Sequence, residues 1–154
     1  MKVLLAIEDS QFADAGIQAV ISQFRPNDTQ VFVLHVVDWN NFMPSPFPRG
    51  GEEAMYSAHK LESIIESEIS TARQLVAHAA ERLGAAGFVT STSVREGDAR
   101  KVILDCATEW GADLILVGSH GRKGVAHLVL GSVSEAVARY APCSVEIVRL
   151  PKKA

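Results

Sequence analysis

Five short strand-like segments, separated by helical periods, constrain the fold of this chain more than any other feature. Residues 3–7, 31–37 and 114–117 are nearly continuous apolar runs of strand length. Runs of this kind are typical of parallel strands that are covered on both faces. Residues 88–95 instead alternate polar and apolar side chains, which indicates a strand with one solvent-facing side. Residues 144–150 form the fifth predicted strand.

Amphipathic helices are predicted between these strands. Apolar residues recur three or four positions apart over residues 13–24, 59–83, 99–110 and 133–140. Asp98 stands where an N-cap is expected. The segment 59–83 holds its period longest, so we expect the longest helix there.

Strands that alternate with helices predict an α/β fold: a doubly wound, five-stranded parallel sheet with helices on both faces. The apolar first and fourth strands belong in its middle and the polar third strand at an edge, which gives the order 3-2-1-4-5. In such sheets ligands bind where the strand order reverses, beyond the carboxyl ends of the strands. We expect Glu8 and Gly118 to meet at that place.

The length of 154 residues predicts one domain over residues 1–154. Residues 38–58 carry three prolines and a Gly-Gly pair, so we expect a long variable connection there, a candidate lid. A net charge of −3 without a basic block argues against nucleic acid as a partner. No apolar stretch approaches the roughly 20 residues of a membrane span, and we expect a cytoplasmic protein without a membrane partner.

The cysteines and His35 are candidates for metal binding or catalysis by residue type, but we predict structural roles for them. Cys106 and Cys143 lack the spacing of a zinc site or a redox pair, and we expect both to pack as small apolar groups. His35 interrupts the second apolar strand, and we expect a core imidazole that is bonded to the backbone.

Residues 118–134 run from the fourth strand into a helix and contain the strongest functional signal. Gly118, Gly121 and Gly131 have no Cβ, so their backbones can adopt positive φ and approach a ligand closely. Ser132 sits where a new helix exposes unpaired N–H groups, an arrangement that suits phosphate. Glycines also end strands and cap helices, and this spacing is neither the P-loop nor the Rossmann pattern.

The wording of this stretch resembles the ATP-binding motif of the universal stress protein family. The motif is carried by Gly-x₂-Gly-x₉-Gly-Ser together with Gly-Ser-His-Gly and Leu-Gly-Ser-Val-Ser-Glu. The resemblance continues in Val-Leu-Leu-Ala-Ile-Glu-Asp-Ser at 3–10, Leu-His-Val-Val at 34–37, Arg-Glu-Gly-Asp at 95–98, and the run that begins Gly-Ala-Asp at 111. It implies a fold like that of the adenine nucleotide alpha hydrolases, and only the proline-rich connection lies outside it.

The resemblance also implies a ligand, ATP with Mg²⁺, and a set of residues that contact it. Adenine would be read by backbone groups near Val36, and the glycine loop with its serine would hold the phosphates. The implied contacts are Ala6, Ile7, Glu8, Asp9, Ser10, Val36, Val37, Gly118, His120, Gly121, Arg122, Gly131, Ser132, Val133 and Ser134. We name no residue as a ligand of the metal ion.

The acidic residues after the first strand depart from the family pattern. Aspartate is usual where this chain has Glu8, with Asp9 beside it. Either residue can take the role near the ribose and the phosphates. The alternative is a solvated helix start at Glu8, Asp9 and Ser10, whose acids favour the positive end of the helix dipole.

The charged residues of the loop also have two interpretations. Arg122 and Lys123 either pair with phosphate or are exposed loop charges. His120 either packs against the end of the sheet or touches a phosphate. No carboxylate is spaced to orient a histidine as a base, so we predict no catalytic residue and slow or absent hydrolysis.

The resulting hypothesis is an ATP-binding module of the stress response. The alternatives are a slow ATPase on the same fold and an interaction protein that binds no nucleotide. The fifth strand, residues 144–150, is too apolar for a free sheet edge, and two copies that pair about a two-fold axis would cover it. We therefore expect a homodimer through this strand.

Overall fold

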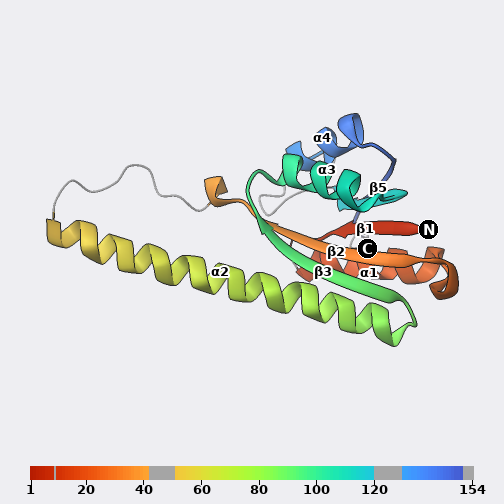
Figure 1. Ribbon diagram of the computed structural model, residues 1–154, viewed down its shortest axis with the longest axis horizontal. Helices are drawn as coiled ribbons and strands as arrows, with labels where there is room; N and C mark the ends of the chain where they lie inside the picture. The colour runs from red at the N-terminus through yellow and green to blue at the C-terminus, as the bar shows by residue number, and fades with distance from the viewer. Residues whose placement is uncertain (9, 42–50, 120–129, 151–154) are drawn as a thin grey trace.

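A computed structural model of the chain describes residues 1–8, 10–41, 51–119 and 130–150. Five parallel strands form one sheet in the order β3-β2-β1-β4-β5 (Figure 1). The strands are β1 (Lys2–Ala6), β2 (Gln30–Val37), β3 (Val89–Glu96), β4 (Leu114–Gly118) and β5 (Ser144–Val148). The predicted doubly wound order 3-2-1-4-5 is confirmed.

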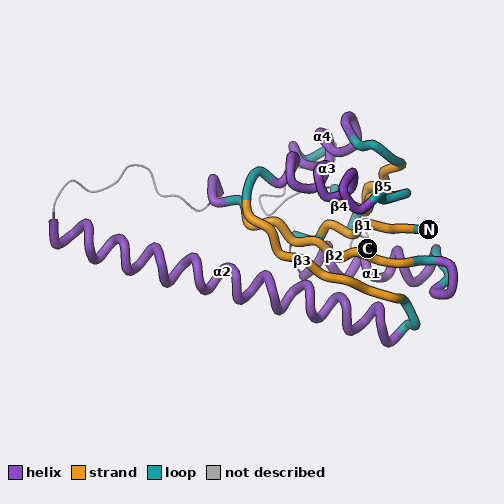
Figure 2. Tube along the Cα trace, in the orientation of Figure 1, coloured by secondary structure: helices purple, strands orange, loops and turns teal. Residues whose placement is uncertain are grey.

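Helices cover both faces of the sheet (Figure 2). They are α1 (Ser10–Gln23), α2 (Gly51–Ala85), α3 (Ala99–Trp110) and α4 (Ser132–Tyr140), with short 3-10 helices η1 (Pro26–Asp28) and η2 (Trp39–Asn41). Side chains of α1 and α2 share one core cluster, which includes Ile17 and Leu83. Side chains of α3 and α4 share the other, which includes Ile103 and Val137.

Strand β1 supplies side chains to both cores. Val3 and Leu5 face α1 and α2, whereas Leu4 faces α3 and α4, and none is more than 1% exposed. This alternation is what a strand covered on both faces requires, because successive side chains point to opposite sides. At the sheet edge β3 buries no residue, and Val89 is 66% exposed.

Helix α2 begins at Gly51, eight residues before the predicted start at His59. Its 35 residues span about 52 Å at 1.5 Å per residue, and the amino-terminal part projects past the sheet (Figure 1). All its core residues lie between Ala72 and Leu83, and no side chain over residues 58–71 is buried. Residues 51–58 lack the sustained apolar period from which the helix was predicted, so periodicity placed its start too late.

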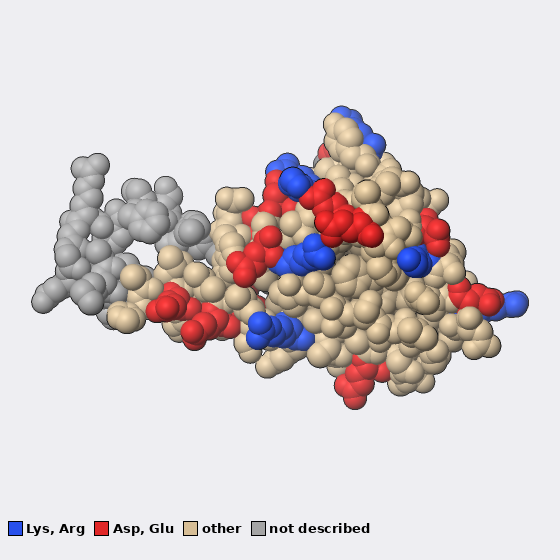
Figure 3. All heavy atoms as spheres, viewed as in Figure 1, with Lys and Arg blue, Asp and Glu red and all other residues tan. Residues whose placement is uncertain are grey.

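Acidic side chains mark this projecting part of α2 (Figure 3). Glu62 and Glu66 are exposed there, and Glu68 is half-buried. Apolar Ile64 is 38% exposed on the same stretch. The helix is therefore anchored to the sheet by its carboxyl-terminal half.

Strand β5 ends at Val148, two residues before the predicted end. Its last pairing sets Val148 opposite Gly118, the final residue of β4. The Ser119 N–H then donates to the Val148 carbonyl over 2.9 Å and closes the ladder. The strand ends because its partner does.

Helix α3 has the N-cap that its sequence predicts and a glycine at its C-cap. Asp98 accepts a hydrogen bond from the Arg100 N–H over 2.9 Å, and Gly111 ends the helix with φ of 68°. The Arg100 guanidinium also donates to both oxygens of the Asp98 carboxylate, over 3.0 and 2.6 Å. This side-chain hydrogen bonding is the largest of the effects that lower the pKa of Asp98 to about 2.

Within the described residues, no helix combines the length and the apolar character that crossing a bilayer demands.

We predict that the two halves of α2 differ sharply in their contribution to stability. Leu83 is 0% exposed in the core, so Leu83→Ala is expected to lower the free energy of unfolding by about 2–5 kcal/mol. Ile64→Ala, on the projecting part, is the matched control and is expected to change it by less than about 0.5 kcal/mol. Urea titration measures both. Comparable losses at the two positions would contradict this anchoring of the helix.

We predict that Asp98 stabilises α3 in a pH-dependent way. Asp98→Ala removes the N-cap and is expected to cost about 1 kcal/mol at pH 7. Because the folded pKa lies below the ordinary value of 3.8, this stabilisation is complete above pH 4 and is lost as pH falls toward 2. Urea titrations from pH 7 down to pH 2 should show the unfolding free energies of the two proteins converging at the acid end. Asp105→Ala, which removes an exposed ion pair with Lys101, serves as the control, and a gap that is constant with pH would refute the capping role.

Candidate functional site

The strand order reverses between β1 and β4, which lie side by side with Ala6 opposite Val117. The chain after β1 enters α1 on one face of the sheet, and α4, which follows β4, packs on the other. Glu8 and Gly118 therefore lie just beyond the same edge of the sheet, at the place where ligands bind in doubly wound folds.

Gly118 is needed for packing and not for an unusual backbone. A Cβ at this position would lie 2.8 Å from Cδ1 of Phe12 in α1, closer than real Cβ contacts allow. Neither Gly118 nor Gly131 uses the positive φ that a glycine can adopt: among the described residues only Gly87, Gly97 and Gly111 have positive φ. Gly131 has φ of −64° and ψ of 157°, which any residue adopts. Gly121 lies outside the described residues.

A clasp of hydrogen bonds joins the two ends of the loop between β4 and α4. The Gly131 N–H donates to the Ser119 carbonyl over 2.9 Å. The hydroxyl of Ser134, 2% exposed, lies 2.9 Å from the Gly131 carbonyl and 3.3 Å from that of Ser119. Buried Ser134 thus donates within the clasp, and its contact with a ligand stays a prediction.

Helix α4 begins immediately after this clasp. The Glu135 N–H donates to the Gly131 carbonyl over 2.9 Å, and Gly131, the N-cap residue, has no side chain to cap the first turn. The N–H groups of Ser132, Val133 and Ser134 precede the first intrahelical donor, so none of the three has a partner within the helix. Together with the helix dipole they suit an anion, and Ser132 is exposed beside them.

The end of β2 offers a pair of backbone groups. The Leu34 carbonyl accepts from the Ile7 N–H over 2.9 Å, so the backbone groups of Leu34 face β1. Because alternate residues of a strand direct these groups to opposite sides, the N–H and C=O of Val36 also face that side, beyond the end of β1 at Ala6. Val37 faces β3, where its carbonyl accepts from the Gly97 N–H over 3.1 Å.

His35 lies beside this pair and fulfils its prediction. It is 5% exposed, and its Nδ1 lies 2.8 Å from the Ile7 carbonyl. A carbonyl oxygen only accepts, so Nδ1 carries the proton.

The acidic side of the site is described in part. Ala6, the last residue of β1, and Glu8, two residues further on, are half-buried, and Ile7 between them is buried. Helix α1 begins at Ser10, so Ser10 is the first helical residue and not the N-cap that precedes it. Asp9, His120, Arg122 and Lys123 lie outside the described residues. Across the described parts of the chain, no three His, Cys, Asp or Glu side chains group as metal ligands.

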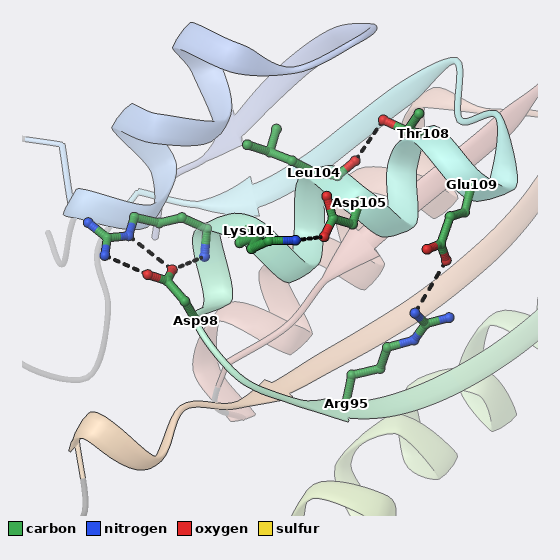
Figure 4. A network of polar contacts seen from close by, with 8 residues as sticks. Arg95, Asp98, Lys101, Leu104, Asp105, Thr108 and Glu109 are labelled. Carbon is green, nitrogen blue, oxygen red and sulfur yellow. Dashed lines mark hydrogen bonds and ion pairs between the residues drawn. The ribbon is translucent and has the colours of Figure 1, made fainter.

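Two polar contacts that the sequence did not indicate join the end of β3 to η2 and to α3. Trp39 Nε1 donates to Glu96 Oε2 over 2.8 Å, and Arg95 pairs with Glu109 over 3.3 Å. Figure 4 shows Arg95 and Glu109 approaching one another from β3 and α3. The strand register contained the signal for the first contact, because Val37, two residues before Trp39, pairs with Glu96.

Both cysteines behave as packing residues. Cys106 is 1% exposed in the α3–α4 core, and burial raises the pKa of its thiol. Burial also raises the pKa of half-buried Cys143. A raised pKa keeps a thiol protonated at neutral pH and therefore a poor nucleophile.

The sequence profile of the universal stress protein family matches residues 1–149. A universal stress protein of Synechocystis is 29% identical over 149 residues, which are 96% of this chain and 97% of the relative. The structure of the universal stress protein UspA from Lactobacillus plantarum superposes with a TM-score of 0.75 at 19% identity and covers 97% of each chain.

Three other similar structures of this fold contain adenine nucleotides. A universal stress protein from Archaeoglobus fulgidus with dAMP has a TM-score of 0.60, 18% identity and coverage of 96% of this chain and 97% of its own. An Arabidopsis thaliana family protein with AMP bound has a TM-score of 0.63 at 16% identity and covers 98% of this chain and 92% of its own. A universal stress protein in complex with cAMP has a TM-score of 0.61 at 21% identity, with coverage of 98% of each chain. With a family profile that spans residues 1–149 and this shared fold, the chain belongs to the universal stress protein family.

Proposed function

We propose that this chain binds an adenine nucleotide, with ATP as the expected form, and acts as a nucleotide-dependent module of the stress response. The observation that carries the proposal is the first turn of α4, whose N–H donors have no side-chain cap and lie at the reversal of strand order. The dAMP, AMP and cAMP of the three similar structures share an adenine base and a phosphate. Their common chemistry supports a site that reads the base and holds a phosphate.

Each part of the ligand has a matching group in the chain. The phosphates would lie at the α4 N-terminus near Ser132, and the base at the backbone pair of Val36. Glu8, after β1, would face the ribose. When Mg²⁺ accompanies the nucleotide, carboxylate and phosphate oxygens are the ligands that it prefers, and Glu8 is the described carboxylate that follows β1.

The groups at the start of α4 favour binding of the nucleotide over its efficient hydrolysis. Backbone N–H groups and a serine at a helix start hold negative charge but do not take a proton from water at neutral pH. His120, Gly121 and Arg122 belong to the proposed phosphate loop on the strength of the family resemblance.

We predict that Gly131→Val weakens ATP binding at least tenfold, about 1.4 kcal/mol. The φ and ψ of Gly131 are accessible to valine, so the fold is expected to persist while the new side chain occupies the space of the phosphate. Isothermal calorimetry measures the affinity. Gly84→Ala in α2 is the matched control, because a Cβ there meets no atom within 4 Å. Unchanged affinity in a folded Gly131→Val protein would disprove the site.

The outer edge of β5 supports a second part of the proposal, a homodimer through residues 144–150. Val145 and Ile147 are half-buried, and Leu150 is 36% exposed. The Val148 carbonyl accepts from Ser119, so the backbone of Val148 faces β4 and that of Ile147 faces the open edge. Two such edges, paired antiparallel about a two-fold axis, would satisfy one another.

Ile147→Pro is expected to convert the dimer to a monomer without unfolding it, because the N–H that it removes points away from β4. Glu146→Pro is the matched control, since its N–H faces β4 and its loss should destabilise the fold. Val148 suits neither test, because it is 9% exposed in the core. Light scattering at tens of micromolar, with circular dichroism, separates the outcomes. A monomeric unmodified protein would exclude this dimer.

A further inference from the structure

The ladder between β1 and β2 ends in an unusual exchange of partners. The Ile7 N–H donates to the Leu34 carbonyl, as a parallel ladder requires. The next bond of that ladder would run from the Val36 N–H to the Ile7 carbonyl. Among the described residues the structure has no such bond, and the Ile7 carbonyl instead accepts from Nδ1 of His35 over 2.8 Å.

The position of His35 explains how this exchange happens. Val31 and Val33 of β2 belong to the core beneath α1 and α2, whereas Leu34 and Val36 face α3 and α4. By alternation, the imidazole of His35 lies on the α1 and α2 side. To meet the ring, the Ile7 carbonyl must turn out of the plane of the sheet toward that side. The backbone groups of Val36 stay in the plane, where β1 no longer runs.

We propose that His35 is a positioning residue for base recognition: its ring holds the Ile7 carbonyl away from the Val36 N–H and so leaves the Val36 N–H and C=O for the ligand. A backbone N–H beside a C=O matches the acceptor N1 and the donor N6 of adenine. Hypoxanthine presents a donor and an acceptor in the reverse order, so the same pair rejects it. This inference rests on the proposed nucleotide binding.

The test compares ATP with inosine triphosphate, which differ at these two base positions and carry the same triphosphate. The unmodified protein is expected to prefer ATP roughly tenfold or more, because a mismatched base leaves polar groups unpaired. His35→Leu removes the donor, frees the Ile7 carbonyl to take the Val36 N–H, and should reduce the preference to within about threefold. His35→Asn places an amide N–H near the position of Nδ1 and should restore it.

The ratio of the two affinities distinguishes positioning from a general loss of structure. Damage to the fold weakens both triphosphates together, whereas loss of positioning weakens ATP selectively. Full preference retained in folded His35→Leu would overturn the inference and leave the proposed function intact. An unmodified protein that binds neither triphosphate would instead overturn the proposed function and this inference with it.

A second measurement needs no variant and covers the case in which His35→Leu does not fold. Amide hydrogen exchange by NMR should find the Val36 N–H poorly protected in the free protein and protected once ATP binds. Inosine triphosphate should protect it less. A Val36 amide that is already as protected as its neighbours on β2 without nucleotide would overturn the role of His35.

Discussion

The central place of β1 between β2 and β4 is the constraint on which the rest of the structure depends. Val3, Leu4 and Leu5 are at most 1% exposed, so this strand is covered on both faces and paired on both edges. A strand in that position forces the chain to leave it toward one face and to leave β4 toward the other. The divergence brings the end of β1 and the start of α4 to one edge of the sheet. The geometry of the candidate site thus follows from the central position of this buried strand.

Sequence periodicity predicted the features that burial controls. The strand order, the edge position of β3 and the burial of Cys106 all follow from which side chains need water and which avoid it. The start of α2 was mispredicted because residues 51–58 carry no sustained apolar period. A helix extends through such a stretch from its packed carboxyl-terminal half, because propagation adds one hydrogen bond for each residue that it orders.

The sequence indicated where the candidate site lies, but it did not show why the glycines of the motif stand at their positions. The glycines of the motif drew attention to the loop between β4 and α4, yet Gly118 is small because Phe12 packs against it, and Gly131 has an ordinary backbone. A glycine in the sequence shows that a position has no side chain, but it does not show which neighbouring residue fills that space. The clasp at Ser119 and Ser134 was missed for a related reason: its acceptors are carbonyls, which every residue has, so no residue pattern marks them.

Buried side chains donate hydrogen bonds to backbone carbonyls at the edge of the sheet where β1 and β4 end. Ser134 occupies the carbonyls that flank α4, and His35 occupies the carbonyl that follows β1. In each case a buried side chain donates to a backbone carbonyl at this edge. Buried polar groups must be paired, so such side chains decide which backbone groups the fold uses and which remain for a ligand. Fixed donors of this kind need no rearrangement when an anion or a base arrives, and this favours binding over proton transfer.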